Sequence, residues 1–291
     1  MKLKPWLYIA LPLMFLTALF LYFAYTKDEA WAKWAAFPFV ALAATWIMNP
    51  QIDWWFYKRN PPALDADIQR IIEDYFAFYQ KLAPDLKKRF RDRLAMFMLG
   101  NEFIRPPRPD EVGEKPPMPQ DIKAAVAAVA VQVNFGKEKF LTEKFENVVV
   151  YPHPFPTPQY EAFHTAEIYE PDGVILFSAE QLMAGFNNPQ QFFSIGLYEY
   201  ARVFKILHPS VSYPNFNESE IWESLEKISG MKRDFIESII GLPNADVFGV
   251  ATHHFLTFGE RFLIVLPDVY QLLSNIYNQN PADGVHPILK Y

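Results

Sequence analysis

The sequence predicts an α+β protein in which an N-terminal helical hairpin precedes a mainly helical domain with a small β-sheet. Residues 5–25 form an uncharged apolar run, and residues 34–48 form a second, shorter one. Beyond these runs, apolar residues recur mostly at helical spacing, and short strand patterns occur only between residues 147 and 178. We therefore expect a helical hairpin at residues 1–50 and a second domain at residues 51–291.

The apolar run at residues 5–25 is long enough to cross the hydrocarbon core of a membrane, which takes about 20 apolar residues. A cleaved secretory signal is the alternative, because Lys2 and Lys4 give the run a basic start. The run is longer than the apolar core of a usual signal, however, and no good small-residue cleavage site follows it. We predict a retained membrane helix, which pairs with residues 34–48 to form a transmembrane hairpin.

Basic residues set the expected orientation of this hairpin, because cytoplasmic flanks of membrane helices are enriched in lysine and arginine. The connector TKDEAWAK has two lysines beside two carboxylates, whereas the outer flanks carry Lys2, Lys4, Lys58 and Arg59. We therefore expect both chain ends in the cytoplasm. This makes the chain a multi-pass protein of the bacterial inner (cytoplasmic) membrane, with the lipid bilayer as one partner. The ring-rich segment DWWFYKR after the second run suits an aromatic belt at the membrane interface.

Composition excludes several classes of function. The chain has no cysteine, which excludes disulfides, cysteine-ligated zinc, iron–sulfur clusters and thiol nucleophiles. A formal net charge of −6 and a pI near 5.6 give no reason to expect a nucleic acid as partner. The sequence also lacks a G-x-S-x-G motif, a Gly-rich phosphate loop and a dinucleotide-binding fingerprint.

Hydrophobic spacing predicts helices along most of the second domain, together with three short strands. The expected helices lie at residues 65–82, from Pro84 onward, and at 120–135, 178–185, 188–207, 218–229, 244–258 and 262–278. The strand patterns are NVVVYPHPF, FHTAEIYE and GVILFS. Asp65 is a plausible N-cap of the first helix. A Pro-rich connector near residues 104–119 separates the first two helices from the remainder.

The segment SIGLYEYARVF, residues 194–204, carries the most informative pattern. It has the composition of a buried helix, yet it contains Tyr198, Glu199 and Arg202. If Tyr198 and Arg202 were both histidine, the string would be H-E-x-x-H, the helix motif that binds zinc in metallopeptidases. Farther along the chain, PNADVFGVATHHFLTFGERF predicts another helix, which Asp246 precedes.

The order of these segments resembles the Mlc titration factor A family of zinc peptidases. The resemblance covers roughly residues 75–285, and rests on a helical pair, an alanine-rich helix, the strand VVVYPHPF and a helix of H-E-x-x-H form. It implies a zincin-like domain, in which two histidines one helical turn apart and a carboxylate bind zinc. It also implies that Glu199 occupies the general-base position. Asp246 would then occupy the third-ligand position, where the family has a glutamate.

The two histidine positions depart from the family pattern. A tyrosine hydroxyl titrates near pH ~10, so Tyr198 is a poor zinc ligand at neutral pH. Arg202 has no lone pair to donate, because its guanidinium group stays protonated. We therefore expect a degenerate motif of Tyr198, Glu199, Arg202 and Asp246, with no catalytic residue, no metal and no other cofactor.

Removal of a dication would leave Glu199 and Asp246 as buried carboxylates without a counter-charge, which is costly. One interpretation is that Arg202 replaces the charge of the metal by a bidentate pair with Glu199 or Asp246. The alternative is that Arg202 points to solvent and Tyr198 is an ordinary core residue.

A rebuilt zinc site is a further alternative, with Glu199, Asp246 and either His253 or His254 as ligands. Adjacent residues on a helix diverge by about 100°, so the two histidines do not easily face one ion. A hydrogen-bonded polar core is the favoured interpretation of these buried polar residues.

These observations predict a membrane-anchored pseudo-metallopeptidase that acts as a structural or protein-interaction subunit of a membrane-associated complex. The resemblance implies binding functions beside peptidase activity, because the protein that gives the family its name captures a transcription repressor. One alternative is an active metallopeptidase with an unorthodox ligand set. A second alternative is a membrane anchor that recruits a soluble regulatory protein.

Overall fold

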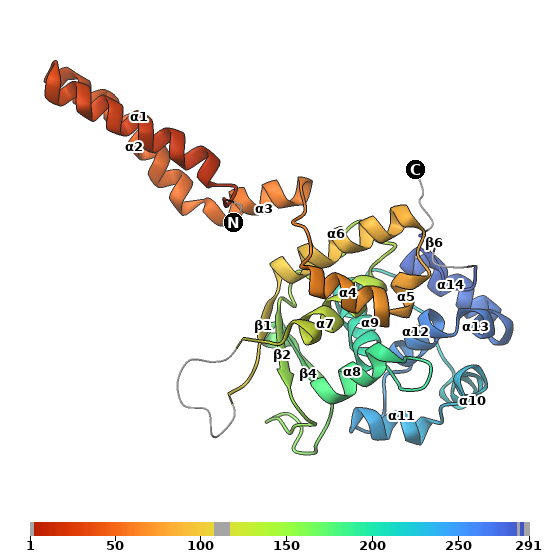
Figure 1. Ribbon diagram of the computed structural model, residues 1–291. Coiled ribbons are helices and arrows are strands. Elements are labelled where there is room, and N and C mark those ends of the chain that lie inside the picture. The colour runs from red at the N-terminus through yellow and green to blue at the C-terminus, as the bar shows by residue number, and fades with distance from the viewer. Residues whose placement is uncertain (1–2, 108–116, 284–285, 288–291) are drawn as a thin grey trace. The chain divides into compact units, whose positions relative to one another are not determined.

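The computed structural model describes residues 3–107, 117–283 and 286–287. The chain forms two units, residues 1–62 and residues 63–291, which are coloured continuously along the chain in Figure 1. Each unit has its own packed elements. The structure confirms the α+β class.

The first unit contains the predicted helical hairpin. It comprises α1 (Leu7–Thr26), a short 3-10 turn η1 (Glu29–Trp31), α2 (Ala32–Ile47) and α3 (Asn49–Arg59). Helices α1 and α2 lie side by side along their length (Figure 1). By length and composition, α1 and the stretch from Glu29 to Ile47 are able to cross a membrane. The ring-rich exit segment forms a helix of its own, α3.

The second unit begins with a helical layer of α4 (Ala66–Tyr75), α5 (Ala77–Gln80), α6 (Pro84–Gly100) and α7 (Gln120–Val133). The Asp65 carboxylate caps α4 by accepting a hydrogen bond from the Asp67 amide at 2.9 Å, as the sequence predicts. The helix expected at residues 65–82 is interrupted at Phe76, whose backbone is extended. This break turns the Phe76 ring inward, where it stacks on Phe186 with the ring centroids 5.0 Å apart.

The sheet has four strands, in the order β1-β2-β4-β3. Strands β1 (Glu102–Ile104), β2 (Asn147–Tyr151) and β4 (Val174–Ser178) are parallel, and β3 (Ala166–Tyr169) pairs with β4 in the antiparallel sense. The three predicted strands are confirmed. Strand β1 was not predicted, because its three residues directly precede the Pro-rich connector and show no alternation. Residues 108–116 of that connector lie outside the described residues.

The remainder of the unit is mainly helical. Its elements are α8 (Ala179–Asn187), α9 (Ile195–Leu207), α10 (Glu218–Ser229), α11 (Arg233–Ile240), α12 (Val247–Thr257), α13 (Gly259–Val265), α14 (Pro267–Tyr277) and the short pair β5 (Gln279–Asn280) and β6 (His286–Pro287). The helix expected at residues 188–207 begins only at Ile195, where Ser194 caps its N-terminus. Pro267 divides the helix expected at residues 262–278, and α11 was not predicted.

Helix α7 lies at the centre of the second unit, where it packs against α4, α6, α8 and α9. Its residues from Ala124 to Val133 are all buried. Alanine side chains let neighbouring helices approach closely, and Gly196 of α9 completes this contact. A Cβ atom at Gly196 would lie 2.7 Å from Cγ2 of Val129. The close packing fixes α9, the helix that carries Tyr198, Glu199 and Arg202, against the middle of the core.

Candidate functional site

Helix α9 is a core helix that carries one buried acidic residue. Ser194 caps its N-terminus by accepting a hydrogen bond from the Leu197 amide at 3.4 Å. The helix packs against α7, α8 and α12 and against strands β3 and β4. Glu199 is fully buried on this helix, whereas the side chain of Arg202 is one-third exposed. A carboxylate in such a position requires hydrogen bonds or a counter-charge.

Arg202 supplies that counter-charge to Glu199. Its Nη1 atom donates to both carboxylate oxygens of Glu199, at 2.9 Å to Oε1 and 2.6 Å to Oε2. Burial raises the pKa of the Glu199 carboxyl group, and the guanidinium group of Arg202 opposes that rise. The carboxylate in turn raises the pKa of Arg202, so the guanidinium stays charged. Of the two partners considered for Arg202, the structure has Glu199. One nitrogen bridges the carboxylate, in place of the two-nitrogen fork that we expected.

Tyr198 and Asp246 join α9 to α12. The Asp246 amide donates to the Tyr198 hydroxyl oxygen at 3.0 Å, and the Asp246 carboxylate caps α12 by accepting from the Gly249 amide at 2.8 Å. Gly249 is required where the two helices meet, because a Cβ atom there would lie 2.7 Å from Cδ2 of Tyr198. The Tyr198 ring is buried and lies 5.4 Å from the guanidinium carbon of Arg202. Tyr198 is therefore a core residue whose hydroxyl group also connects two helices.

The Asp246 carboxylate pairs with Lys205 rather than with Arg202. The Lys205 Nζ atom lies 3.5 Å from Oδ2 of Asp246, and both side chains are partly exposed. The charges of α9 and α12 thus form two separate pairs, a buried one between Glu199 and Arg202 and a partly exposed one between Lys205 and Asp246. Asp246 nevertheless lies close enough to contribute to the raised pKa of Glu199.

A second buried acidic residue, Glu167 of β3, was missed by the sequence analysis. Its Oε2 atom accepts a hydrogen bond from the Thr157 hydroxyl group at 2.8 Å and lies 3.0 Å from Nε2 of His164. His164 Nδ1 lies 2.8 Å from the Ala162 carbonyl oxygen, which only accepts, so Nδ1 carries a proton. Thr157 and His164 therefore both contact the buried carboxyl group of Glu167. The only sequence signal was a histidine three residues before a glutamate in a strand pattern, which is too common to single out.

His253 and His254 belong to α12 and are fully buried. His253 Nε2 accepts a hydrogen bond from the Ser194 amide at 3.2 Å, and the two Nδ1 atoms lie 3.1 Å apart. Burial lowers the pKa of His253 well below its ordinary value and lowers the pKa of His254 to about 3. Both imidazoles are therefore neutral at pH 7, and they face Ser194 and each other.

The donor groups at this site do not fit a zinc ion. Both oxygens of Glu199 accept hydrogen bonds from Arg202, Arg202 itself has no lone pair, and the Tyr198 hydroxyl oxygen accepts from a backbone amide. Zinc requires three or four nitrogen, oxygen or sulfur donors that converge on one point. Within the part of the chain that the structure describes, no group of three or more histidine, aspartate and glutamate side chains is placed to hold a metal ion. The alternative set of Glu199, Asp246 and one histidine does not come together.

The family of this chain follows from a match to one family model. The model is that of the glucose-regulated metallo-peptidase M90 family, and it matches residues 52–278. The chain belongs to this family. The match begins within α3 and ends just after α14, so it includes α9 and α12. It confirms the resemblance to the Mlc titration factor A family and the zincin-like class of the second unit. A comparison with curated proteins finds no match.

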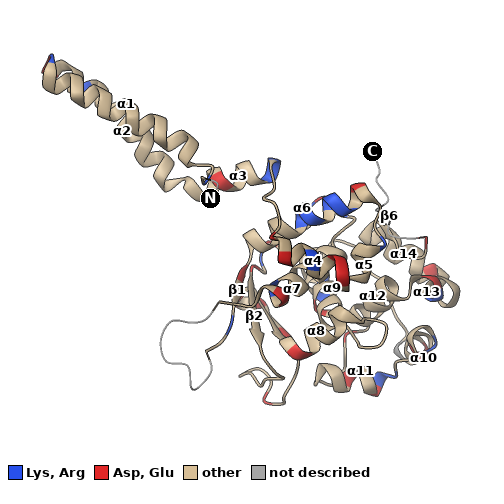
Figure 2. Cartoon of the chain, in the orientation of Figure 1, with Lys and Arg blue, Asp and Glu red and all other residues tan. Residues whose placement is uncertain are grey.

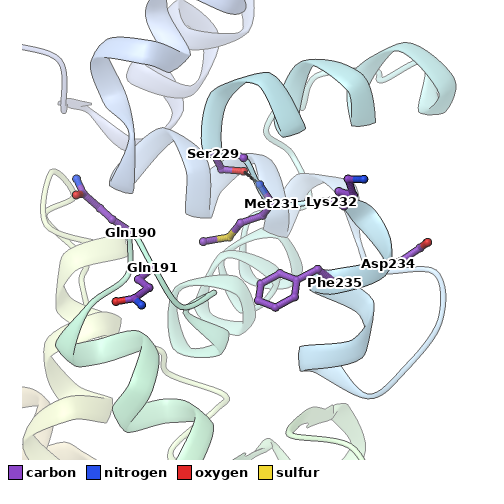
Figure 3. Close-up of a pocket in the computed structure, with 8 residues that line it drawn as sticks. Gln190, Gln191, Ser229, Met231, Lys232, Asp234 and Phe235 are labelled. Carbon is purple, nitrogen blue, oxygen red and sulfur yellow. Dashed lines mark hydrogen bonds between the residues drawn. The ribbon is translucent and has the colours of Figure 1, made fainter.

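A surface pocket lies apart from these charge pairs. It has a volume of about 440 Å³ and lies between the loop that precedes α9 and the turn that joins α10 to α11. Figure 3 shows Met231 and Phe235 directed towards Gln191, with the Met231 amide hydrogen-bonded to Ser229. Its lining residues are Gln190, Gln191, Ser229, Gly230, Met231, Lys232, Asp234 and Phe235. Tyr198, Glu199, Arg202 and Asp246 do not line it, so the pocket is distinct from the charge pairs of α9 and α12.

The pairing of Arg202 with Glu199 predicts a stability loss that depends on pH. Arg202→Met should lower the free energy of unfolding by about 2–4 kcal/mol at pH 7, because it leaves the buried carboxylate of Glu199 without its counter-charge. The variant also removes the group that opposes the raised pKa of Glu199. Below pH ~4.3 Glu199 is protonated in both proteins, so the loss should be small there. The loss should grow as the pH rises above the raised pKa of Glu199 in the folded wild-type chain, because the carboxylate then forms beside Arg202 in the wild type and has no counter-charge in the variant.

The matched control is Lys205→Met on the same helix, whose partly exposed pair with Asp246 should contribute less than about 1 kcal/mol. Urea unfolding of the full chain in detergent, measured at several pH values, gives both losses. Equal losses in the two variants, or an Arg202→Met loss that does not change with pH, would contradict the assigned pairing.

Proposed function

We propose that this M90 chain is a membrane-anchored pseudo-metallopeptidase and serves as a structural or protein-interaction subunit of a membrane-associated complex. The observation that carries this proposal is the contact of Arg202 with both carboxylate oxygens of Glu199. In a zinc peptidase the corresponding glutamate takes a proton from a metal-bound water, which requires a free carboxylate oxygen and a metal beside it. In this chain the guanidinium group of Arg202 donates to both carboxylate oxygens of Glu199, so neither oxygen is free to accept a proton from a metal-bound water.

Arg202 has a structural role in this proposal. We infer that it replaces the positive charge of the family's metal ion beside Glu199, while the Tyr198 hydroxyl group connects the same helix to the start of α12. A guanidinium group carries one charge where zinc carries two, and the pair of Lys205 with Asp246 supplies the second cation. The zincin-like scaffold would thereby keep its packing without the metal and remain available for contacts with other proteins.

The apolar hairpin supports the membrane part of the proposal. Helix α1 and the stretch Glu29–Ile47 are long and apolar enough to span a bilayer, and both carry many exposed apolar side chains. We propose that they form a two-span anchor in the bacterial inner membrane, with both chain ends and the second unit in the cytoplasm. Membership of a metallopeptidase family favours one rival, an active peptidase with an unorthodox ligand set.

Zinc content separates the two functions. The purified wild-type chain should hold far less than about one zinc ion per chain, because its donor set does not converge. Tyr198→His with Arg202→His should gain measurable zinc affinity, because the two positions are one helical turn apart. Adding Asp246→Glu should tighten binding, because a carboxylate one methylene longer reaches farther. Little or no peptidase activity is expected from either variant.

Elemental analysis and zinc titration measure these outcomes, with Tyr198→Phe as the control that adds no ligand. A stoichiometric zinc ion in the wild-type chain, together with peptide hydrolysis, would establish the rival enzyme. A folded triple variant that binds no zinc would show that residues 194–204 do not correspond to the family's zinc helix.

The interaction role predicts a larger assembly in the membrane. In gently solubilised membranes the chain should elute at a size well above one chain in its micelle. Glu199→Gln should leave that size unchanged, because the amide oxygen still accepts from Arg202 and the proposed role does not use a base. Size-exclusion chromatography with light scattering gives the mass of the protein part. Elution as a single chain would contradict a role as a complex subunit.

The proposed orientation predicts the side of the membrane on which a C-terminal fusion lies. A reporter attached after Tyr291 should be active only if it is a type that works in the cytoplasm, because the basic flanks favour that side. A fluorescent protein and an alkaline phosphatase at the same position form a matched pair. Phosphatase activity with a dark fluorescent fusion would reverse the orientation.

A further inference from the structure

Helix α3 separates from α2 at a defined break. Met48 has a non-helical backbone conformation (φ −91°, ψ 10°), and Pro50 lies in the first turn of α3. Figure 1 shows α3 leaving the end of α2 at an angle to the hairpin. The ring-rich segment therefore changes direction where the apolar part of α2 ends, instead of continuing it.

A hydrogen bond ties α3 to the start of the first helix. The Trp6 amide, which precedes α1, donates to Oδ1 of Asp53 at 2.8 Å. The Trp6 ring also packs edge-on against Trp46 near the end of α2, with the centroids 5.6 Å apart. The beginning of α1, the end of α2 and α3 thus meet at one end of the hairpin. One carboxylate oxygen of Asp53 thus accepts a hydrogen bond on the side of α3 that faces the hairpin.

The other side chains of α3 divide between two further faces. Gln51 and Lys58 are seven residues apart, so they share a face, and both are exposed. Ile52 and Phe56 are four residues apart, on a different face, and are half-buried. Trp55 lies between these two faces, three residues after Ile52 and four after Gln51, whereas Trp54 lies beside Gln51 and Lys58. Each ring contacts a cation, with Lys58 over Trp54 at 5.7 Å and the Arg59 guanidinium over Trp55 at 3.8 Å.

Neither bulk water nor the hydrocarbon core suits this helix. With 11 residues it is about 16 Å long, and it carries Asp53, Lys58 and Arg59, so it is too short and too charged to extend a span. Figure 2 shows acidic and basic residues on α3, whereas α1 and α2 are almost free of them along their length. In water it would leave the Trp55 side chain 58% exposed. Tryptophan, tyrosine, lysine and arginine together are typical of the membrane–water interface, where rings lie at the level of the headgroups.

We infer that α3 is an interfacial helix that lies along the membrane surface and binds the lipid headgroup region. Ile52 and Phe56 contact the outer part of the acyl chains, and Gln51 and Lys58 face water. Trp55, between these two faces, lies at the level of the headgroups, and Arg59 contacts headgroup phosphates. The hydrogen bond from Trp6 to Asp53 holds α3 at that depth. The inference rests on the proposed insertion of the hairpin and adds to it a lipid-binding surface outside the spans.

The absence of cysteine from the chain allows a direct test with single-cysteine variants of the full-length protein. Gln51→Cys, Ile52→Cys, Phe56→Cys and Lys58→Cys are labelled with an environment-sensitive dye in vesicles of phosphatidylcholine and phosphatidylglycerol. Phe15→Cys in α1 is the control, because that side chain is 67% exposed in the middle of the hairpin. Aqueous iodide and lipid-attached nitroxide quenchers are compared at each position.

Labels at positions 52 and 56 should be quenched several-fold more by nitroxide than by iodide, and labels at 51 and 58 should show the reverse. If the control label at position 15 is in lipid while all four α3 labels are in water, α3 does not lie at the interface. That result would overturn the inference but leave the proposed membrane anchor intact. All four labels in lipid would make α3 part of a span and also overturn the inference. A control label in water would overturn the proposed anchor itself, and the inference with it.

Discussion

A buried carboxylate without a counter-charge would destabilise the centre of the second unit, and the contact between Glu199 and Arg202 prevents this. Glu199 is fully buried on α9, a helix held against the core by α7 and joined to α12 through Tyr198 and Asp246. The Arg202 side chain is one-third exposed, so the pair lies at the edge of the core and not wholly inside it, which lowers the cost of desolvation. A buried carboxylate requires a positive charge beside it, and Arg202 supplies that charge to Glu199.

The same contact links the family to the proposed loss of its chemistry. An M90 scaffold built for a dication has to balance acidic groups on neighbouring elements, and Asp246 and Glu167 both contribute to the raised pKa of Glu199. In this chain each acidic group has its own partner, Lys205 for Asp246 and His164 for Glu167. The three acidic groups thus have three separate partners. The scaffold keeps the packing of α9 against α12, which Gly249 makes possible.

Patterns that depend on local chemistry were predictable from the sequence, and those that depend on tertiary contacts were not. The apolar hairpin, the cap at Asp65 and the three strands have local signals, and the structure confirms them. The interruption at Phe76 and the edge strand β1 depend on contacts with distant residues. At the site, residue types alone excluded Arg202 as a zinc ligand. They did not decide between Glu199 and Asp246 as its partner, because that choice depends on how α12 meets α9.

A double-mutant cycle between Glu199 and Arg202 measures how strongly the two side chains interact. Glu199→Gln, Arg202→Met and the double variant are unfolded in urea at pH 7, and the coupling free energy is the part of their effects that does not add. A direct buried pair predicts a favourable coupling of about 1–3 kcal/mol, with the double variant more stable than Arg202→Met alone. A coupling near zero would contradict this pairing, because it would mean that Arg202 does not neutralise Glu199 in solution.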